Sequence, residues 1–240
     1  MDLLDNEFDF TIENSVEWLD TSRLEGGIEQ KEQQPEFNPY KLEFPSNIII
    51  CGITNSQKTT IALHILKNNY KNFNRILVAT TTDEDYKKIL DKDKIIINPS
   101  IDNIEDILKY QNRHKKTKTL LILDDLIGSV NMGRNKIFDR IATTSRHMNL
   151  SVIFIVQHIN SISPIIRNNS KYLFVTHVKL NNLEKLYEMI DGFENFNDFK
   201  AFYKQYNEEY IAYLFCLFRS KNPYYVFQVN VPNKFFIKQK

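Results

Sequence analysis

Short apolar runs alternate with amphipathic segments along most of the chain. The runs have the length of strands and lie at residues 47–52, 75–82, 94–98, 119–125, 150–157 and 171–178. The segments between them carry apolar residues among strong helix formers and lie at residues 59–70, 104–113 and 135–147. Continuous apolar strands separated by helices are typical of a parallel sheet that is covered on both faces. The pattern therefore predicts an α/β domain.

The last part of the chain breaks this alternation. Residues 193–230 predict one helix and then two aromatic-rich strands, joined as a hairpin around residues 219–223. Aromatic side chains on paired strands pack in the core or across the strands more often than they stack on nucleic-acid bases. We therefore expect the following aromatic residues to make core or cross-strand contacts: Tyr213, Phe215, Phe218, Tyr224, Tyr225 and Phe227.

The first 45 residues have a different composition. They mix Gly-Gly, Gln, Glu and Pro without a helical or strand period, which predicts a flexible leader at residues 1–45 and a folded domain at residues 46–240. Within the leader, residues 8–20 place aromatic residues, Trp18 among them, between acidic ones. Such a segment either becomes ordered on a partner or packs on the flank of the domain.

The net charge of +1 conceals an uneven distribution. Residues 1–45 carry 12 Asp and Glu against 3 Lys and Arg, whereas residues 46–240 carry 18 against 28. The leader is therefore acidic and the domain basic. A basic domain is compatible with a polyanionic partner such as nucleic acid, because neutralised phosphates release counterions, and it is equally compatible with charges scattered over the surface.

The positions of the cysteines and the hydropathy of the chain indicate the cellular compartment of the protein. Cys51 and Cys216 lie within apolar runs, which favours buried thiols in a reducing compartment over a disulfide. No apolar stretch reaches the roughly 20 residues that span a bilayer. The acidic start lacks the basic and then apolar order of a signal peptide. We expect a soluble protein without a membrane partner.

The segment GITNSQKTT, which begins at Gly52, is the first candidate for a nucleotide site. A loop that leads from a buried strand into a helix offers backbone N–H groups to phosphates, and a Lys reaches the outer phosphates. Lys58 and Thr59 match this pattern, but Gln57 occupies a position where G-x-x-x-x-G-K-[ST] requires glycine. A Cβ there restricts the backbone, although Asn55 adopts a left-handed conformation more easily than most residues. On its own, the segment is equally compatible with a solvated helix start.

An acidic pair follows the buried strand that begins at residue 119. Asp124 and Asp125 stand at its carboxyl end, where open α/β sheets place their sites. In nucleoside triphosphatases the first such acid supports Mg²⁺, and the second can polarise the attacking water. An acidic pair is also common as a turn or helix cap. Its combination with the upstream loop is what favours a site.

Two further segments, SRHMNLSVIFIVQ at residues 145–157 and PIIRNN at residues 164–169, add a more specific signal. Together with the loop and LLILDDL, they resemble the packaging ATPases of large double-stranded DNA viruses, virophages and viral-like transposons, within the FtsK and HerA superfamily. The resemblance covers roughly residues 46–230. It implies a P-loop NTPase of the RecA-like type with an additional strand, a mostly parallel central sheet, helices on both faces and a C-terminal β-hairpin.

The resemblance also implies roles for residues around the nucleotide. Lys58 would bind the β- and γ-phosphates of ATP, Thr59 would hold Mg²⁺, and Asp124 would support Mg²⁺ through water. Asp125 would replace the more usual Glu as the hydrolytic base. Besides Lys58 and Thr59, the resemblance assigns the following loop residues to the nucleotide: Gly52, Asn55, Ser56, Gln57 and Thr60.

Three more residues receive roles in catalysis from the resemblance. Gln157 would sense the γ-phosphate, with the capping of its own strand as the alternative. Arg146 and Arg167 are candidates for an arginine that acts on the transition state in a neighbouring subunit. We prefer Arg146 because its segment is the more specific one. An ordinary surface ion pair is the alternative for either arginine.

The functional hypothesis is an ATPase that drives double-stranded DNA into a viral capsid. The resemblance implies a ring of identical subunits in the host cytoplasm or the viral factory, with the virion as a further location. The leader is a candidate for docking on a capsid protein. One alternative is a pseudo-ATPase that serves as a DNA-binding or structural subunit because Gln57 impairs turnover. A nucleotide kinase would need an arginine-rich lid and a nucleoside pocket, and the sequence indicates neither.

Two basic clusters lie before predicted strands, at residues 67–75 and 113–118. They either line a DNA channel or solvate the face opposite the nucleotide. Connections that precede parallel strands lie at the amino edge of the sheet, away from the predicted phosphates. This position favours solvation.

Overall fold

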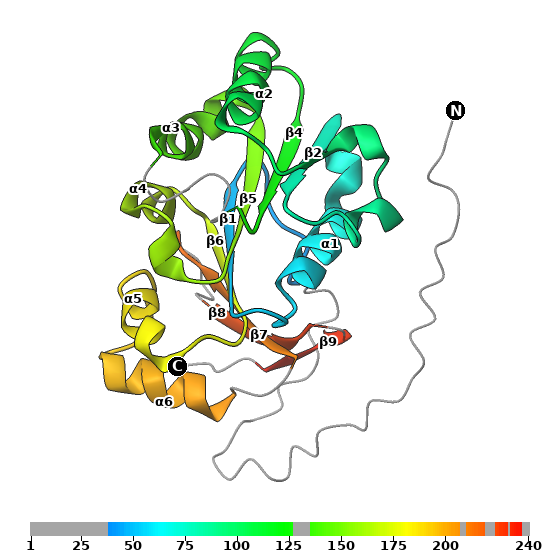
Figure 1. Ribbon diagram of the computed structural model, residues 1–240. Helices are drawn as coiled ribbons and strands as arrows, with labels where there is room; N and C mark the ends of the chain where they lie inside the picture. Colours follow the sequence, from blue (N-terminus) through cyan, green and yellow to red (C-terminus); the bar gives the residue numbers. More distant parts are fainter. Residues whose placement is uncertain (1–37, 127–134, 207–209, 219–223, 230, 237–240) are drawn as a thin grey trace. The chain divides into compact units, whose positions relative to one another are not determined.

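The computed structural model describes residues 38–126, 135–206, 210–218, 224–229 and 231–236, and these residues form a sheet with helices on both faces (Figure 1). The strands are β1 (Asn47–Cys51), β2 (Arg75–Thr80), β3 (Ile95–Ile97), β4 (Thr119–Asp124), β5 (Leu150–Val156), β6 (Tyr172–Val175), β7 (Ile211–Cys216), β8 (Tyr224–Gln228) and β9 (Val231–Phe236). The helices are α1 (Lys58–Asn69), α2 (Ile101–Arg113), α3 (Lys136–Thr144), α4 (Pro164–Asn168), α5 (Leu183–Tyr187) and α6 (Phe196–Gln205).

The nine strands are arranged in the order β3-β2-β4-β5-β1-β6-β7-β8-β9. The first six in this order pair in parallel, and β7, β8 and β9 continue the sheet antiparallel. Strand β5 lies between β1 and β4, which is the position of the additional strand. The predicted α/β class, the mostly parallel sheet and the C-terminal hairpin of β7 and β8 are confirmed. Strand β9 and the short helices α4 and α5 extend this prediction.

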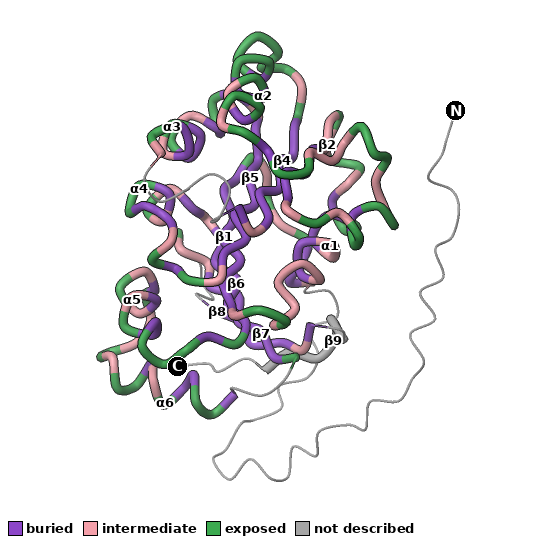
Figure 2. The backbone as a smooth tube through the Cα atoms, in the orientation of Figure 1, coloured by how far each residue is buried: buried purple, intermediate pink, exposed green. Residues whose placement is uncertain are grey.

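The central strands are buried because helices cover both of their faces. All five residues of β1 and all seven of β5 are buried, and Figure 2 shows these central strands in purple. Ile48 and Ile50 of β1 belong to the same core cluster as Ile61 and Ile65 of α1. Helices α2, α3 and α4 lie on the opposite face (Figure 1). Burial on both faces explains why these strands are continuously apolar in sequence.

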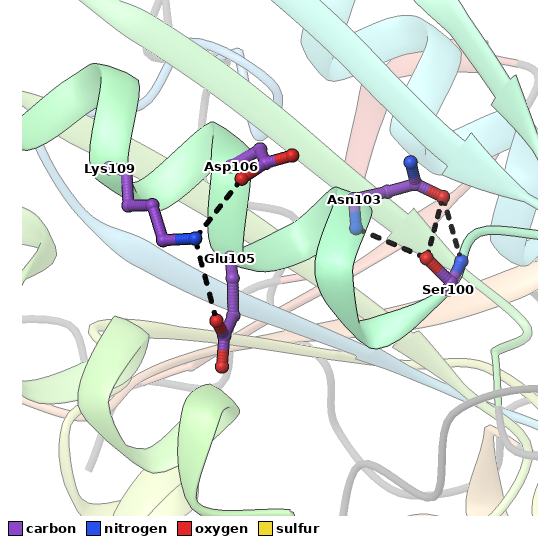
Figure 3. Close-up of polar contacts among 5 residues, drawn as sticks. All are labelled: Ser100, Asn103, Glu105, Asp106 and Lys109. Carbon is purple, nitrogen blue, oxygen red and sulfur yellow. Dashed lines mark hydrogen bonds and ion pairs between the residues drawn. The ribbon is translucent and has the colours of Figure 1, made fainter.

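Helix α2 illustrates how local sequence fixes an element. The Ser100 hydroxyl accepts the backbone N–H of Asn103 at 3.2 Å, and the Asn103 side chain accepts the backbone N–H of Ser100 at 2.9 Å (Figure 3). This capping box satisfies two backbone donors at the helix start. One turn later, Lys109 lies 3.2 Å from Asp106 and 3.7 Å from Glu105.

The C-terminal part of the chain packs through aromatic rings. Phe202 of α6 meets Tyr213 of β7 with ring centroids 5.6 Å apart, and Phe199 meets Phe215 at 6.2 Å. The structure buries five of the six aromatic residues that the sequence assigned to core or cross-strand contacts, at 9% exposure or less. Phe218 is the exception, because it follows β7 and is 43% exposed.

The described chain begins within the predicted leader and packs on the domain from Tyr40 onward. Tyr40 is fully buried, its hydroxyl donates to the carbonyl of Val229 at 2.7 Å, and its ring stacks on His64. Leader residues 1–37, with the aromatic segment around Trp18, lie outside the described residues. Among the described residues, no helix is long and apolar enough to cross a membrane.

Candidate nucleotide site

The carboxyl ends of four parallel strands meet at one edge of the sheet. Cys51 at the end of β1 pairs with Val156 of β5 and Val175 of β6, and Asp124 at the end of β4 pairs with Ile155 of β5. Residues that follow these strands are therefore neighbours, as Ser56 and Thr176 are across 120 positions of the chain. The sequence predicted the residues for the phosphates, Mg²⁺ and hydrolysis at this edge.

Gly52 connects β1 to the nucleotide loop, which we define as residues 52–59, the last two of which are also the first residues of α1. Its N–H donates to the carbonyl of Val156 at 3.1 Å, and the next N–H, of Ile53, donates to His177 at 2.8 Å. A Cβ at position 52 would lie 1.8 Å from the Thr176 hydroxyl oxygen and 2.5 Å from that of Ser56. Only glycine fits this position.

The loop reaches α1 through two residues in the left-handed conformation. Asn55 has φ 59°, and Gln57 has φ 68° and ψ 17°. Gln57 thus takes the backbone conformation that glycine adopts without strain. Its carbonyl accepts the N–H of Ile61 at 3.0 Å and so begins the helix. The loop is closed at the helix start even though the residue there carries a Cβ.

Lys58 at the start of α1 is half-buried and folds back on the loop. Its ammonium donates to the carbonyl of Ile53 at 2.6 Å, and the Ser56 hydroxyl donates to the same carbonyl at 2.6 Å. Burial lowers the pKa of Lys58, and the nearby carboxylates of Asp125 and Asp124 oppose this shift. Thr60 follows in the first turn of α1 and is also half-buried.

Asp124 joins the nucleotide loop to β4. One of its carboxylate oxygens accepts the Thr59 hydroxyl at 3.1 Å and the Tyr86 hydroxyl at 2.7 Å. Asp124 is only 7% exposed. Burial raises the pKa of its carboxyl, and the two hydrogen bonds oppose that shift. Burial also raises the pKa of Tyr86, so that its hydroxyl remains a donor at neutral pH.

Asp125 connects β4 to β5 at the same edge. Its backbone has φ 51°, and its N–H donates to the carbonyl of Ile155 at 3.4 Å. The Gln157 side-chain amide donates to both carboxylate oxygens of Asp125, at 3.0 and 3.2 Å. Gln157, which the resemblance assigns to sensing, is therefore hydrogen-bonded directly to Asp125, which the resemblance assigns to hydrolysis.

The two candidate arginines lie away from this cluster. Arg146 is exposed in the 3-10 turn before β5, whereas Gln157 follows the other end of that strand. Arg167 closes α4, and its guanidinium donates to the carbonyl of Ile159 at 3.4 Å and of Ile162 at 3.3 Å. Burial lowers the pKa of Arg167. A role for either arginine in a neighbouring subunit stays a prediction.

Two residues of the site were missed in the sequence. Tyr86 lies in a polar segment after β2, where no pattern distinguishes it from its neighbours. Thr176 follows β6, and its hydroxyl lies 2.7 Å from that of Ser56. The sequence does show that Thr176 is a polar residue directly after an apolar strand. Assigning it to the site also required knowing that β6 is the neighbour of β1.

The oxygen atoms of the cluster suit a hard cation. Mg²⁺ is commonly bound by one or two protein oxygens together with waters and substrate phosphates, and the Thr59 hydroxyl and the Asp124 carboxylate supply that type of ligand. Among the described residues, no group of three or more His, Cys, Asp or Glu side chains is placed to hold a metal ion. The arrangement fits a cation that is shared with bound phosphates.

Comparison with known proteins identifies the family. Residues 35–192, about two thirds of the chain, match the family described as Poxvirus A32 protein. The chain belongs to the poxvirus A32 protein family. A search of curated protein sequences finds no match.

Solved structures share the fold of this poxvirus A32 family protein. One is the genome packaging NTPase B204 of Sulfolobus turreted icosahedral virus 2 in complex with AMPPCP, with a TM-score of 0.55, 18% identity, and coverage of 75% of this chain and 94% of B204. Another is B204 in complex with sulfate, with a TM-score of 0.59, 14% identity, and coverage of 77% and 96%. At this identity the likeness shows the fold alone, that of a P-loop NTPase.

Proposed function

We propose that this A32 family protein uses ATP to drive double-stranded DNA into a viral capsid. The observation that carries the proposal is the hydrogen bond between Thr59 and Asp124, which joins the nucleotide loop to the acidic strand across 65 positions of sequence. The hydrogen bond between Gln157 and Asp125, the residue next to Asp124, supports the same assignment. The fold shared with a genome packaging NTPase supports the same activity.

The nucleotide loop binds the phosphates of ATP in this proposal. Backbone N–H groups at the start of α1 favour negative charge, because the helix dipole adds to them. Lys58 exchanges the carbonyl of Ile53 for the outer phosphates and contributes a full positive charge. The B204 structures in complex with AMPPCP and ATP-gammaS support ATP as the ligand.

Thr59 and Asp124 hold Mg²⁺ beside the phosphates. When bound, the ion supplies positive charge against the phosphate oxygens as negative charge develops on them. Tyr86 fixes the carboxylate of Asp124 through its 2.7 Å hydrogen bond. Outer contacts of this kind orient a ligand before the ion arrives.

Asp125 orients the attacking water and accepts its proton. The side-chain amide of Gln157, at the end of the neighbouring strand β5, donates to the Asp125 carboxylate. A change at the γ-phosphate that moves Asp125 therefore also moves the side chain of Gln157, at the end of β5. We assign Gln157 to this sensing role.

The subunits form a ring in which Arg146 or Arg167 of one copy completes the site of the next. Arg146 is exposed and therefore accessible to a neighbouring copy, whereas Arg167 is partly occupied by carbonyl groups of its own chain. This difference favours Arg146. The ring acts in the cytoplasm or the viral factory of an infected cell, with the leader as the contact to the capsid.

A second candidate function is a hydrolysis-impaired subunit that binds DNA or supports the capsid. The observation that favours it is the Cβ of Gln57 at a left-handed position of the nucleotide loop. A side chain there competes for space with the phosphates. The two candidates differ in ATP turnover and share nucleotide binding.

Measuring ATP turnover with and without long duplex DNA tests the proposal. We expect turnover that rises when DNA is present. Lys58→Ala should lower it by at least about 100-fold, because the developing phosphate charge loses its point-charge partner. Lys88→Ala, a change at an exposed lysine outside the site, is the control. A folded wild-type protein that binds ATP without turnover would favour the second candidate.

A further inference from the structure

Three connections meet at the amino edge of the sheet, opposite the nucleotide. They precede the neighbouring strands β2, β4 and β5, and we call residues 70–75, 113–118 and 145–149 the amino-edge surface. Hydrogen bonds link them to one another. The N–H of Asn74 donates to the carbonyl of Lys118 at 2.8 Å, and the side chain of Asn149 donates to the carbonyl of Lys115 at 2.7 Å.

The buried side-chain amide of Gln111 holds two of these connections in place. Gln111 of α2 is fully buried, and its side-chain nitrogen donates to the carbonyl of Thr117 at 2.7 Å and of Met148 at 2.6 Å. Its side-chain oxygen accepts the hydroxyl of Thr119 at 2.6 Å. The connections are thus held in one arrangement before any partner binds, which lowers the entropy lost on binding.

The amino-edge surface carries seven Lys and Arg residues and no Asp or Glu. The seven are Lys71, Arg75, Arg113, Lys115, Lys116, Lys118 and Arg146. All of them except Arg75 are exposed. Among the described residues, ion pairs occupy lysines elsewhere, as at Lys87 and Lys109, but none involves a member of this surface. Glu105 and Asp106, further back along α2, pair with Lys109 (Figure 3).

The half-buried arginine of this surface is held by an aromatic ring. The guanidinium of Arg75 lies 4.2 Å from the ring centroid of Tyr110, and His114 stacks on the same tyrosine at 4.1 Å. Tyr110 is the last large apolar side chain before the end of α2 and remains 39% exposed. Contact with a ring face restricts the motion of a guanidinium without neutralising its charge.

We propose that the amino-edge surface binds the phosphate backbone of double-stranded DNA. This proposal rests on the proposed function and adds the place where the duplex is held. Three neighbouring strands about 4.8 Å apart spread the connections over roughly 10 Å, between the widths of the minor and major grooves. The long basic side chains therefore reach phosphates on both sides of one groove. Lysines and arginines on phosphates give affinity without sequence preference.

The position of this surface separates DNA binding from nucleotide binding. Strand β4 runs from the connection that contains Lys118 to Asp124, and β5 runs from the connection that contains Arg146 to Gln157. The duplex and the nucleotide therefore contact opposite ends of the same two strands. We expect DNA to bind the full chain without nucleotide, and we expect Lys58→Ala to leave that affinity within about 3-fold of wild type.

The test removes charge from one connection of the full chain. A triple variant replaces lysines with glutamine at Lys115, Lys116 and Lys118. We expect its affinity for a duplex of about 30 base pairs to fall on the order of 100-fold at 0.1 M salt, and the slope of log affinity against log salt to decrease by about 2 to 3. Fluorescence anisotropy between about 50 and 300 mM salt measures both quantities.

A matched control removes the same charge elsewhere, at the exposed residues Lys88, Lys92 and Lys204. It should change affinity by less than about 3-fold, because long-range charge effects are screened at this ionic strength. Equal losses in the two variants, or no loss in either, would overturn the proposed surface. Wild-type protein that fails to bind duplex DNA at low salt would instead refute the proposed function.

A second variant guards against misfolding of the first. Lys71→Gln combined with Arg146→Gln changes the other two connections, and both positions are exposed. Its slope should decrease by about 1 to 2. Thermal unfolding and far-UV circular dichroism like those of the wild type show that a variant is folded. A folded double variant with the wild-type slope would overturn the proposal.

Discussion

Replacing Gln57 with glycine tests the strain in the nucleotide loop. Gln57 has φ 68°, a conformation in which a residue with a Cβ is less stable than glycine by about 1–2 kcal/mol. Glycine also makes the unfolded chain more flexible, which offsets about 0.4–1 kcal/mol of this gain. We therefore expect Gln57→Gly to stabilise the protein by about 0.5–1 kcal/mol, or roughly 1–4 °C in melting temperature for a domain of this size.

The effect on ATP binding has a different origin. A loop that keeps this left-handed conformation on binding carries the same backbone strain with and without nucleotide, so the strain cancels from the affinity. The substitution to glycine changes the affinity because it removes the side chain that would lie beside the bound phosphates. We expect ATP to bind several-fold more tightly, about 1 kcal/mol, as measured by titration calorimetry. A fall in affinity would show that the Gln57 amide contacts the nucleotide.

Gln57→Ala is the matched control, because it shortens the side chain and keeps the Cβ. Its melting temperature should stay close to that of wild type, since alanine is also strained at this φ. Asn55→Gly, at φ 59°, should give a smaller gain because asparagine tolerates this region better. An equal rise in melting temperature for the alanine and glycine variants at position 57 would refute the explanation from backbone conformation.

The remaining predictions concern the acids, the tyrosine and the leader. Asp125→Asn should bind ATP like wild type and stall hydrolysis in a single-turnover assay, whereas equal loss of both would indicate a structural acid. Asp124→Asn should raise the melting temperature of the nucleotide-free protein at neutral pH, because burial raises the pKa of Asp124 and makes its charged form destabilising. That gain should shrink as pH falls through the raised pKa towards the ordinary carboxyl value near 4, and a gain independent of pH would contradict the explanation. Tyr86→Phe should raise the Mg²⁺ concentration needed for half-maximal turnover about 10-fold or more, while turnover at saturating Mg²⁺ changes little. An equal loss of turnover at all Mg²⁺ concentrations would mean that Tyr86 only supports the fold. Deleting residues 1–37 should leave the domain folded, with unchanged DNA affinity and lost capsid association. Tighter DNA binding confined to low salt would show instead that the acidic leader covers the basic domain.

Much of the sheet follows from the sequence because burial on both faces makes its strands continuously apolar. For the same reason, Asp124 and Gln157 could be predicted at one edge, because Asp124 ends one such strand and Gln157 follows another. The apolar pattern does not predict the order of the strands in the sheet. Thr176 could therefore not be assigned to the site, although its hydroxyl contacts Ser56 of the nucleotide loop.

Residues placed by tertiary contacts alone could not be predicted. Tyr86 lies in a 3-10 turn of a polar segment, and only the folded chain brings its hydroxyl to Asp124. The basic clusters show the same limit. Their position at the amino edge indicated simple solvation, and no sequence pattern indicated that Gln111 and Asn149 hold the connections together as one surface.

The contact of Gly52 with Ser56 and Thr176 constrains how relatives of this protein can diverge. Replacing Thr176 by alanine would remove its hydroxyl, but its Cβ would still lie 3.1 Å from a Cβ at position 52, and the Ser56 hydroxyl would lie at 2.5 Å. An alanine at position 52 thus requires changes at both other positions at once. Loss of either hydroxyl removes one hydrogen bond, a cost of about 1 kcal/mol, whereas a Cβ at position 52 overlaps any hydroxyl that remains. Homologues with a larger residue at position 52 should therefore lack both hydroxyls.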